Sequence, residues 1–280
     1  MKKLLLPLLL SVQAFAMQVG NPIGASIVTQ GAGLLNWCPD TLLFNGCLGF
    51  ELGFYGDYIF DKKIKEDGFG ENVMHETTMT TNGGYIALNF FDRVNLEAIL
   101  GATQFCINEF VSASDVVIFN PGPEYASVTD FSWALGARGT IWECGCFGVG
   151  ANVWYFATKP DLNYFNMNGS NPVRNPEGIS WKYWEWQAAL GIAYQLYFAD
   201  TASIVPYAAV DYNNCKLSFD NATLSVTGAA PSITLVDKEK ATNWGYALGL
   251  TLTGCDCFEV SLEGRFSNEK AVAFNTLFRF

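Results

Sequence analysis

The last eleven residues, Lys270 to Phe280, have the sequence KAVAFNTLFRF. Their side chains alternate between two faces, one with Val272, Phe274 and Phe278 and the other with Asn275 and Arg279. A period of two predicts a β-strand. A strand that ends a chain on an aromatic residue is typical of an outer-membrane β-barrel, in which one face meets lipid and the other a lumen. An edge strand of a soluble sandwich fits the same stretch, so the rest of the chain decides.

The chain begins with a pattern typical of exported proteins. Lys2 and Lys3 precede an apolar run, which ends at Ala14-Phe15-Ala16 in the sequence MKKLLLPLLLSVQAFA. A basic start, a short apolar core and small residues two apart predict a signal peptide over residues 1–16. The mature protein is therefore expected outside the cytoplasm.

The composition is unusually apolar for an exported protein. Hydrophobic residues make up 50% of the chain and charged residues only 15%, and the mean hydropathy is positive. A soluble domain of this length is normally richer in charge. Beyond the signal, no run approaches the roughly 20 apolar residues that a membrane-spanning helix needs. Strands that turn every second side chain toward outer-membrane lipid are consistent with both observations.

The charge balance excludes one class of partner. Without Lys2 and Lys3, 14 basic side chains face 27 acidic ones, a net charge of −13. An acidic protein of this kind is not expected to bind nucleic acid. No cofactor is expected either.

Ten alternating segments are found when the chain is followed back from its end. They cover residues 49–60, 84–91, 94–105, 129–142, 147–156, 184–198, 203–219, 243–253, 258–266 and 270–280. The predicted fold class is all-β, a transmembrane antiparallel up-and-down β-barrel with ten identifiable strands in a range of roughly 10 to 16. The barrel domain is assigned to residues 49–280.

Connection lengths support this topology, because outer-membrane barrels have short periplasmic turns and long outer loops. The long connections are 61–80, 108–128, 159–180 and 220–241, and all of them fall on the predicted outer side. Only 267–269 is both short and outer. The charged run DKKIKED from Asp61 is interpreted as a solvated rim. Residues 17–48 are predicted to form a periplasmic or plug segment, with a further strand over Ile23 to Leu35 as an alternative.

Several stretches resemble the chlamydial major outer membrane protein family, a family of porins. They are VGNP at 19–22, GFYGDYIFD at 53–61, ALNFFDR at 87–93 with LGAT at 100–103, FSWALGARGTIWECGC at 131–146, YWEWQAALGIAYQL at 183–196, and the last 23 residues from Phe258. The resemblance implies a pore for ions and small hydrophilic solutes in the outer membrane of a Gram-negative-type, chlamydia-like bacterium. It also implies a homotrimer, exposed variable loops, and cysteines that link the protein to other envelope proteins. Members of the family are usually longer than this chain.

Charged side chains on inward positions are the candidate pore-lining residues. They are Glu51, Asp57, Glu97, Glu185, Glu259 and Glu263, with Arg138, Arg265 and Arg279 as the basic partners. Opposed charges across a lumen restrict a pore and set its ion preference. The acidic excess suggests a mild preference for cations. Pairing of these charges within a narrow barrel, which would close it, is the alternative.

All eight cysteines lie in the predicted mature chain, where an oxidising compartment favours disulfides. The candidates on the predicted periplasmic side are Cys38, Cys47, Cys144, Cys146, Cys255 and Cys257. The two C-x-C turns are poorly suited to bridging internally, so intermolecular disulfides are preferred. A metal site is the weaker alternative, because zinc pairs usually have the spacing C-x-x-C, and none is predicted.

Two other function classes compete with a porin. Outer-membrane proteases and phospholipases need a histidine base, and the only histidine is His75, in a predicted loop between Glu71 and Glu76. Such a histidine is most simply solvated, so no catalytic residue and no enzyme activity are predicted. A surface adhesin or receptor that uses the long outer loops is the alternative to a porin.

Overall fold

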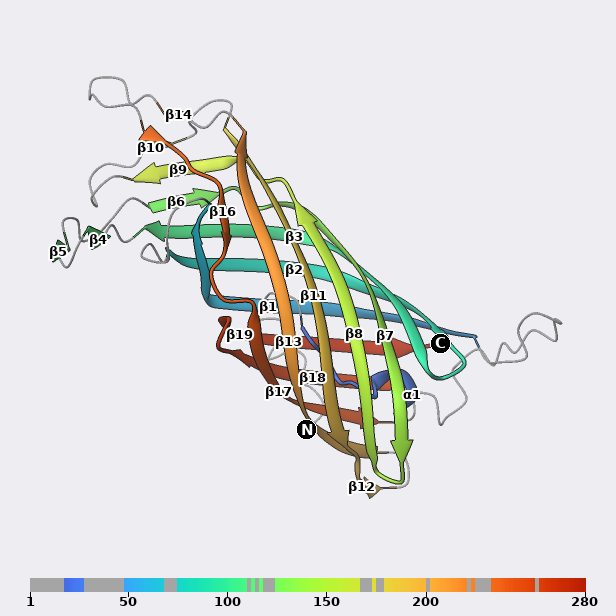
Figure 1. The fold of residues 1–280 in the computed structure, drawn as a ribbon. Helices are drawn as coiled ribbons and strands as arrows, with labels where there is room; N and C mark the ends of the chain where they lie inside the picture. The colour runs from blue at the N-terminus through green and yellow to red at the C-terminus, as the bar shows by residue number, and fades with distance from the viewer. Residues whose placement is uncertain are drawn as a thin grey trace, which may run out of the picture.

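The computed structural model describes residues 18–27, 48–67, 75–109, 112–113, 116–117, 124–166, 173–174, 179–199, 202–220, 223–224, 233–254 and 257–280. Ten strands form one closed antiparallel barrel (Figure 1). In ring order they are β1 (Leu48–Glu66), β2 (His75–Phe90), β3 (Val94–Glu109), β7 (Asp130–Cys144), β8 (Phe147–Thr158), β11 (Ser180–Tyr194), β13 (Ala202–Asp220), β17 (Trp244–Gly254), β18 (Phe258–Phe266) and β19 (Glu269–Arg279). The last strand pairs with the first, from Glu51 opposite Arg279 to Lys62 opposite Glu269. The predicted fold class and strand number are confirmed.

Side chains alternate between the lumen and the outer wall as the sequence predicts. In β19, Val272 and Phe278 are exposed on the outer wall and Phe274 partly so, whereas Asn275 and Arg279 are buried inside. In β17, Trp244, Leu248 and Leu250 are exposed outward and Ala247 inward is fully buried. An apolar wall of this kind is stable only against lipid, because soluble monomers do not expose apolar patches of this size.

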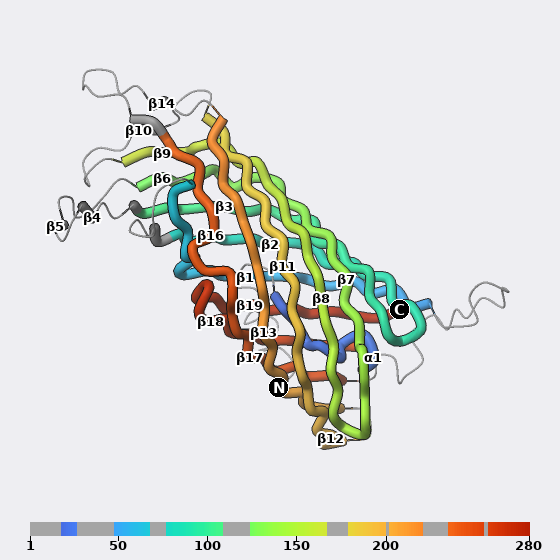
Figure 2. Tube along the Cα trace, viewed as in Figure 1, coloured from blue at the N-terminus to red at the C-terminus, as the bar shows by residue number. Residues whose placement is uncertain are grey.

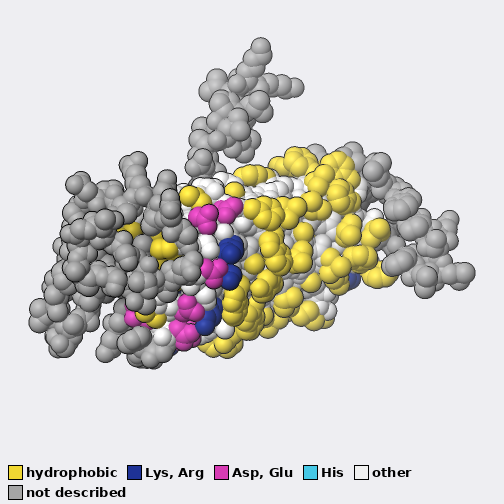
Figure 3. Space-filling model, turned by 90° about the horizontal axis from the view of Figure 1, so that it is seen from above, with side chains coloured by type: hydrophobic (Ala, Val, Ile, Leu, Met, Phe, Trp, Pro, Cys, Tyr) yellow, Lys and Arg dark blue, Asp and Glu magenta, His cyan; other side chains and the backbone are white. Residues whose placement is uncertain are grey.

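Aromatic contacts at two levels border the apolar wall. At the level nearer the long connections, the ring pairs are Trp133 with Tyr155, Trp186 with Tyr212 and Tyr212 with Trp244, with centroids 5.2–5.6 Å apart. At the opposite level they are Trp142 with Phe147 and Phe258 with Phe278, 5.9 Å and 4.9 Å apart. Two aromatic girdles are typical of a barrel whose wall sits in a bilayer. Figure 3 shows the apolar belt and a row of charged side chains beside it.

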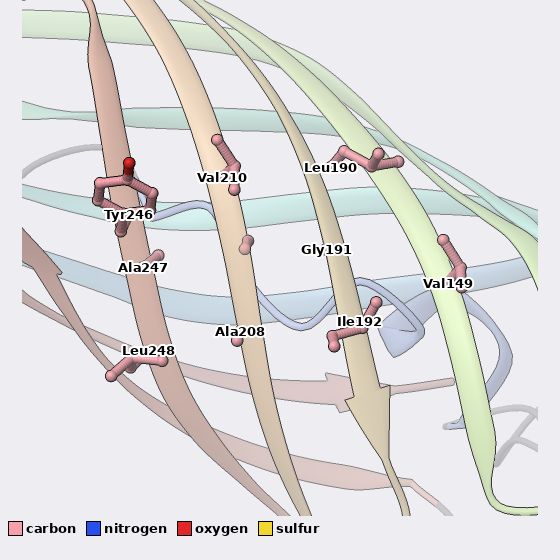
Figure 4. A pocket seen from close by; sticks show the side chains of 10 residues that line it. Val149, Leu190, Gly191, Ile192, Ala208, Val210, Tyr246, Ala247 and Leu248 are labelled. Carbon is pink, nitrogen blue, oxygen red and sulfur yellow. The ribbon is translucent and has the colours of Figure 1, made fainter.

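A shallow apolar groove with a volume of about 370 Å³ crosses the outer wall over β8, β11, β13 and β17 (Figure 4). Leu190, Ile192 and Leu248 rise beside it, while Gly191 and Ala208 leave room at its floor. The groove lies in the lipid-facing belt and is therefore separate from the lumen.

The connections at one end, called the inner end below, are tight turns. Residues 91–93 join β2 to β3, with Phe91 and Asp92 at positive φ and the Arg93 N–H donating to the Phe90 carbonyl at 3.0 Å. Gly145 and Cys146 join β7 to β8, with Gly145 at φ 60°, a conformation that glycine adopts without steric cost. Next to β11, the short strand β12 (Leu196–Ala199) pairs with β13 through a register shift, and all four of its residues are exposed, so the alternation of buried and exposed side chains in β11 ends here.

At the opposite, outer end the predicted long loops are partly wrong, because strands continue into them. β1 extends to Glu66 and β2 begins at His75, so 61–80 contains mainly strand. Short strands add to the sheet here, namely β6 (Glu124–Ser127), β9 (Leu162–Asn166), β10 (Val173–Arg174) and β16 (Lys238–Lys240). Two further pairs, β4 (Ser112–Ala113) with β5 (Val116–Val117) and β14 (Thr223–Leu224) with β15 (Ile233–Thr234), form separate ribbons.

The short strands build a second tier on top of the ring. In the main ring, β17, β18 and β19 lie between β13 and β1. Beyond the outer ends of these three strands, β16 pairs directly with both β1 and β13 and closes the ring at that level. β6 and β9 extend the sheet from β3, and Asp161 bridges Ser180 toward β11. Inside this tier, large apolar side chains pack together, including Ile64, Phe105, Tyr125, Phe165 and Trp181, each 3% exposed or less. The outer tier, defined by these strands and this core, therefore fills the barrel above the belt.

The N-terminal segment lies inside the barrel. Residues 18–26 are all buried, and Gly24–Ile27 form the single turn α1. Figure 2 shows this segment in blue within the ring of strands. No helix in the described part of the chain is long and apolar enough to cross a membrane.

Candidate functional site

The nine candidate pore-lining residues all lie inside the barrel. Glu51, Asp57, Glu97, Arg138, Glu185, Glu259, Glu263, Arg265 and Arg279 are each 5% exposed or less. They come from six strands of the ring, and alternation within each strand directs them inward. The lining of the lumen is therefore charged.

One group of charges crosses the lumen below the outer tier. Lys62 Nζ on β1 lies 2.6 Å from Glu185 Oε2 on β11 and 2.9 Å from Glu269 Oε2 on β19. Arg265 Nη2 lies 2.6 and 2.7 Å from the two oxygens of Asp57, and Arg265 Nε lies 2.9 Å from Glu269 Oε1. Buried charges are tolerated only when paired in this way. The five side chains form a continuous network, called the transverse network below.

Two members of this network are not among the residues that the sequence singled out. Lys62 belongs to the run interpreted as a solvated rim, yet it is 1% exposed and Glu269 is 2% exposed. The register between β1 and its neighbours shifts after Ile59. Phe60 still faces outward, but Asp61 does not turn fully inward and Lys62 does. A β-bulge of this kind has no clear signature in this stretch. Glu269 was detectable, because alternation carried back from Ala271 places it inside.

Lys240 reaches the transverse network from the outer tier. Its Nζ lies 3.6 Å from Glu269 Oε2, and the side chain is fully buried. Burial lowers the pKa of Lys240, and the positive charge of Lys62 lowers it further. Burial removes the ammonium group from water, and this favours the neutral form of the side chain.

A second group of charges lies nearer the inner end. Arg138 Nε on β7 lies 3.3 Å from Glu97 Oε1 on β3. Asn95 Nδ2 donates to Glu51 Oε2 at 3.0 Å, and the Ser261 hydroxyl donates to Glu259 Oε1 at 2.9 Å. No set of three or more metal-ligating side chains occurs in the part of the chain that the structure describes. This group is therefore a polar lining around one arginine.

At the inner mouth, two arginines pair with the turns. Arg279 Nη2 lies 3.0 Å from Asp92 Oδ1, and Arg93 Nη1 lies 2.7 Å from Glu143 Oε2. Arg279 is buried, whereas Arg93 is half exposed. Ion pairs at the inner mouth therefore connect the turn of residues 91–93 to strands β7 and β19.

Only three of the six disulfide candidates lie among the described residues. Cys144 is exposed, Cys146 and Cys257 are half-buried, and all three carry free thiols. They sit at the inner-end turns. Cys38, Cys47 and Cys255 lie outside the described residues. Disulfides to other chains stay a prediction.

His75, Cys106 and Cys215 all lie in strands of the ring. His75 begins β2, opposite Glu109 of β3, so its backbone belongs to a strand and not to a loop. Cys215 is buried in β13, and Cys106 is half-buried in β3 beside Glu124, whose Oε1 is 3.4 Å from its sulfur.

A model of one protein family, described as "Chlamydia major outer membrane protein", matches residues 111–178. Among curated proteins, the "Major outer membrane porin" of Chlamydia pneumoniae is 26% identical over 398 aligned positions, covering all of both chains. That of Chlamydia psittaci is 25% identical over 400 positions, again covering all of both. The serovar L1 porin of Chlamydia trachomatis is 24% identical, covering 95% of each. Because this chain has 280 residues, these alignments include long insertions in the relatives.

Solved structures give weaker similarity. The outer membrane protein OprG from Pseudomonas aeruginosa is 10% identical, with a TM-score of 0.37 over 83% of this chain and 95% of that one. The translocator domain of the autotransporter NalP from Neisseria meningitidis is also 10% identical, with a TM-score of 0.45 over 83% and 88%. The sequence matches are stronger, and they run the whole length of the chain. The chain is thus similar along its whole length to the chlamydial major outer membrane porins, and it is located in the outer membrane.

Proposed function

We propose that this barrel is a diffusion porin for ions and small hydrophilic solutes. The observation that carries the proposal is a closed ten-strand ring whose inward faces bear charged side chains, in a full-length relative of outer-membrane porins. A charged lining stabilises hydrated ions, whereas an apolar lining would exclude them. Recordings from the purified protein in planar bilayers test it. Discrete conductance steps are expected, and their absence at every voltage and salt concentration overturns the proposal.

The ion preference follows from the lining. Six of the nine candidate residues are acidic and three are basic, so we expect a mild preference for cations. A potassium chloride gradient across the bilayer measures it as a reversal potential. Glu259→Gln removes one lumen charge and should shift that potential toward chloride, while Glu239→Gln on the exposed side of β16 serves as the matched control. A wild-type channel that prefers chloride contradicts the assignment.

The lumen as described is closed. The transverse network fills the middle of the lumen, and the apolar core of the outer tier lies above it. A ten-strand barrel is narrow, so solute passage requires these side chains to move apart. We therefore propose a gated rather than a permanently open pore.

Three further parts belong to the proposal: the homotrimer rests on the family resemblance, the disulfides also on the C-x-C turns, and the lack of enzyme activity on the single histidine, His75. The protein assembles as a homotrimer, its inner-end cysteines form disulfides with other envelope proteins, and it has no enzyme activity. Chemical cross-linking in membranes tests the first, and a single monomer band there contradicts it. Electrophoresis without reductant tests the second, with slower species that collapse on reduction as the expected result.

An adhesin or receptor barrel stays the alternative function. Liposome flux separates the two, because a porin releases trapped small solutes without any partner. Binding of host cells by the isolated outer loops, with no flux from loaded liposomes, favours the adhesin.

A further inference from the structure

We propose that residues 18–27 are a displaceable plug that closes the inner half of the lumen. This inference rests on the proposed porin function and names the element that gates the inner half of the lumen, in series with the transverse network and the outer tier. Three observations support it: side chains of the wall hold the segment, the wall behind the segment is recessed, and the segment takes no part in the hydrogen bonds between the strands.

Glu263 of β18 holds the backbone of the plug. The Val19 N–H donates to its Oε1 and the Gly20 N–H to its Oε2, both at 2.8 Å. The Tyr207 hydroxyl of β13 donates to the same carboxylate at 2.9 Å. Hydrogen bonds to an ionised carboxylate are stronger than neutral ones. Glu263 therefore acts as a latch, and Tyr207 positions it.

Other side chains hold the segment from around the ring. The Gln18 N–H donates to Tyr55 Oη at 2.7 Å, and Asn89 Nδ2 donates to the Ala25 carbonyl at 2.8 Å. Asn152 Nδ2 donates to the Val19 carbonyl, and the Ser26 hydroxyl to Glu143. With Glu263, these partners lie on β1, β2, β7, β8 and β18. The segment thus spans the lumen from wall to wall.

The wall behind the plug is hollowed by glycines. A methyl group placed on Gly148 of β8 would overlap the Ile23 side chain, and one on Gly150 would overlap the Pro22 carbonyl. On the other side, a methyl group on Gly20 would overlap the guanidinium of Arg138. Small residues on both surfaces allow the segment to fit, so the recess matches this segment in shape.

The plug is separate from the barrel's strand ladder. Residues 18–22 bond to side chains of the wall, and the only regular structure within 18–27 is the single turn α1. Leaving the lumen therefore breaks none of the inter-strand pairs that close the ring. Water can take the place of the lost partners, because they are charged or polar. Elements of this kind open at a lower free energy than the sheet around them.

A double variant, Ile23→Cys with Gly148→Cys, tests both the position of Ile23 beside Gly148 and the proposed closing of the lumen by the plug. The Ile23 Cβ lies 3.4 Å from the position of a Cβ at residue 148, near the separation of about 3.8 Å in disulfides. Peptide mapping after oxidation should find this bond. Bilayer conductance should fall to the baseline when it forms and return on reduction. Wild-type protein passed through the same oxidation and reduction controls for the native cysteines.

A second variant loosens the latch instead of fixing it. Glu263→Gln keeps the shape but offers one acceptor oxygen for the three donors, so the ratio of open to closed time should rise by about tenfold. Glu239→Gln, at an exposed site remote from the plug, is the matched control. An open-time ratio for Glu263→Gln equal to wild type contradicts the latch.

The outcomes separate the two proposals. A cross-linked channel that conducts like wild type overturns the plug but leaves the porin intact. Failure of the bond to form under oxidation overturns the seating of Ile23 beside Gly148. If neither wild type nor Glu263→Gln conducts, the porin proposal fails, and the gating role fails with it.

Discussion

Lys62 and Glu185 join opposite walls of the barrel, with Nζ and Oε2 2.6 Å apart. Their strands, β1 and β11, are five steps apart in a ring of ten. An ion pair between diametrically opposite strands crosses the full width of the lumen. This pair is both a stabilising contact across the barrel and an obstacle to solutes.

Removing Lys62 should destabilise the barrel strongly. Lys62→Met leaves Glu185 buried without a cationic partner, a loss of about 3–5 kcal/mol in the free energy of unfolding. Denaturant unfolding of the protein in lipid measures it. Lys63→Met, one residue along and turned to the other face, should change stability by no more than about 0.5 kcal/mol. The double variant Lys62→Met with Glu185→Gln should recover part of the stability that Lys62→Met loses. If Lys62→Met were as stable as Lys63→Met, the network would be contradicted.

The outer wall should reject charge in a depth-dependent way. Leu250 lies mid-strand in β17 and is exposed, so Leu250→Arg places a cation within the hydrocarbon and should cost about 2–4 kcal/mol. Phe266→Arg, at the end of β18, reaches the interface and should cost about 0–1 kcal/mol. Unfolding in bilayers of defined thickness compares them. Equal losses at the two positions would argue against the placement of the belt.

Gly249 leaves room for the ring of Tyr207, which positions the latch Glu263. A methyl group on Gly249 would overlap the ring of Tyr207, whose hydroxyl bonds Glu263. Gly249→Ala should therefore lower the free energy of unfolding by about 1–3 kcal/mol. At Gly84, where a methyl group meets no atom within 4 Å, the same substitution should be nearly neutral. Combining Gly249→Ala with Tyr207→Ala relieves the overlap, so the double variant should lose less than the sum of the single losses.

Thiol accessibility should follow the topology. Under reducing conditions a maleimide should label exposed Cys144 before buried Cys215, because reaction requires access to the sulfur. Mass spectrometry of peptides quantifies each site, and the denatured protein, in which all sites label, provides the reference. Early labelling of Cys215 in the folded protein would show that the lumen opens near β13.

Alternation in single strands was predictable, because the backbone of a strand sends successive side chains to opposite faces whatever it pairs with. The inward placement of Asn275 and Arg279, and of Glu259 and Glu263, followed from counting alone. The outer tier was not predictable. β16 has three residues and β9 has five, too few for a period of two to stand out among the polar residues around them.

Local pattern also failed at Lys62, where the bulge after Ile59 reverses the faces. A bulge is decided by the register of both neighbouring strands, and those residues lie far away in the chain: Thr77 and Glu269 oppose Lys62.

The order of side chains along the chain was enough to predict the class of this protein: an outer-membrane barrel with ten strands, a lipid-facing wall, a charged lining and tight inner turns. These depend on side-chain order along the chain, which local geometry converts into faces. Which charges meet depends on how the ring closes. Lys62 and Glu185 are 123 residues apart, and Glu263 meets Gly20 across 243. Such contacts follow from the closure and register of the ring, which bring together residues that no local pattern relates.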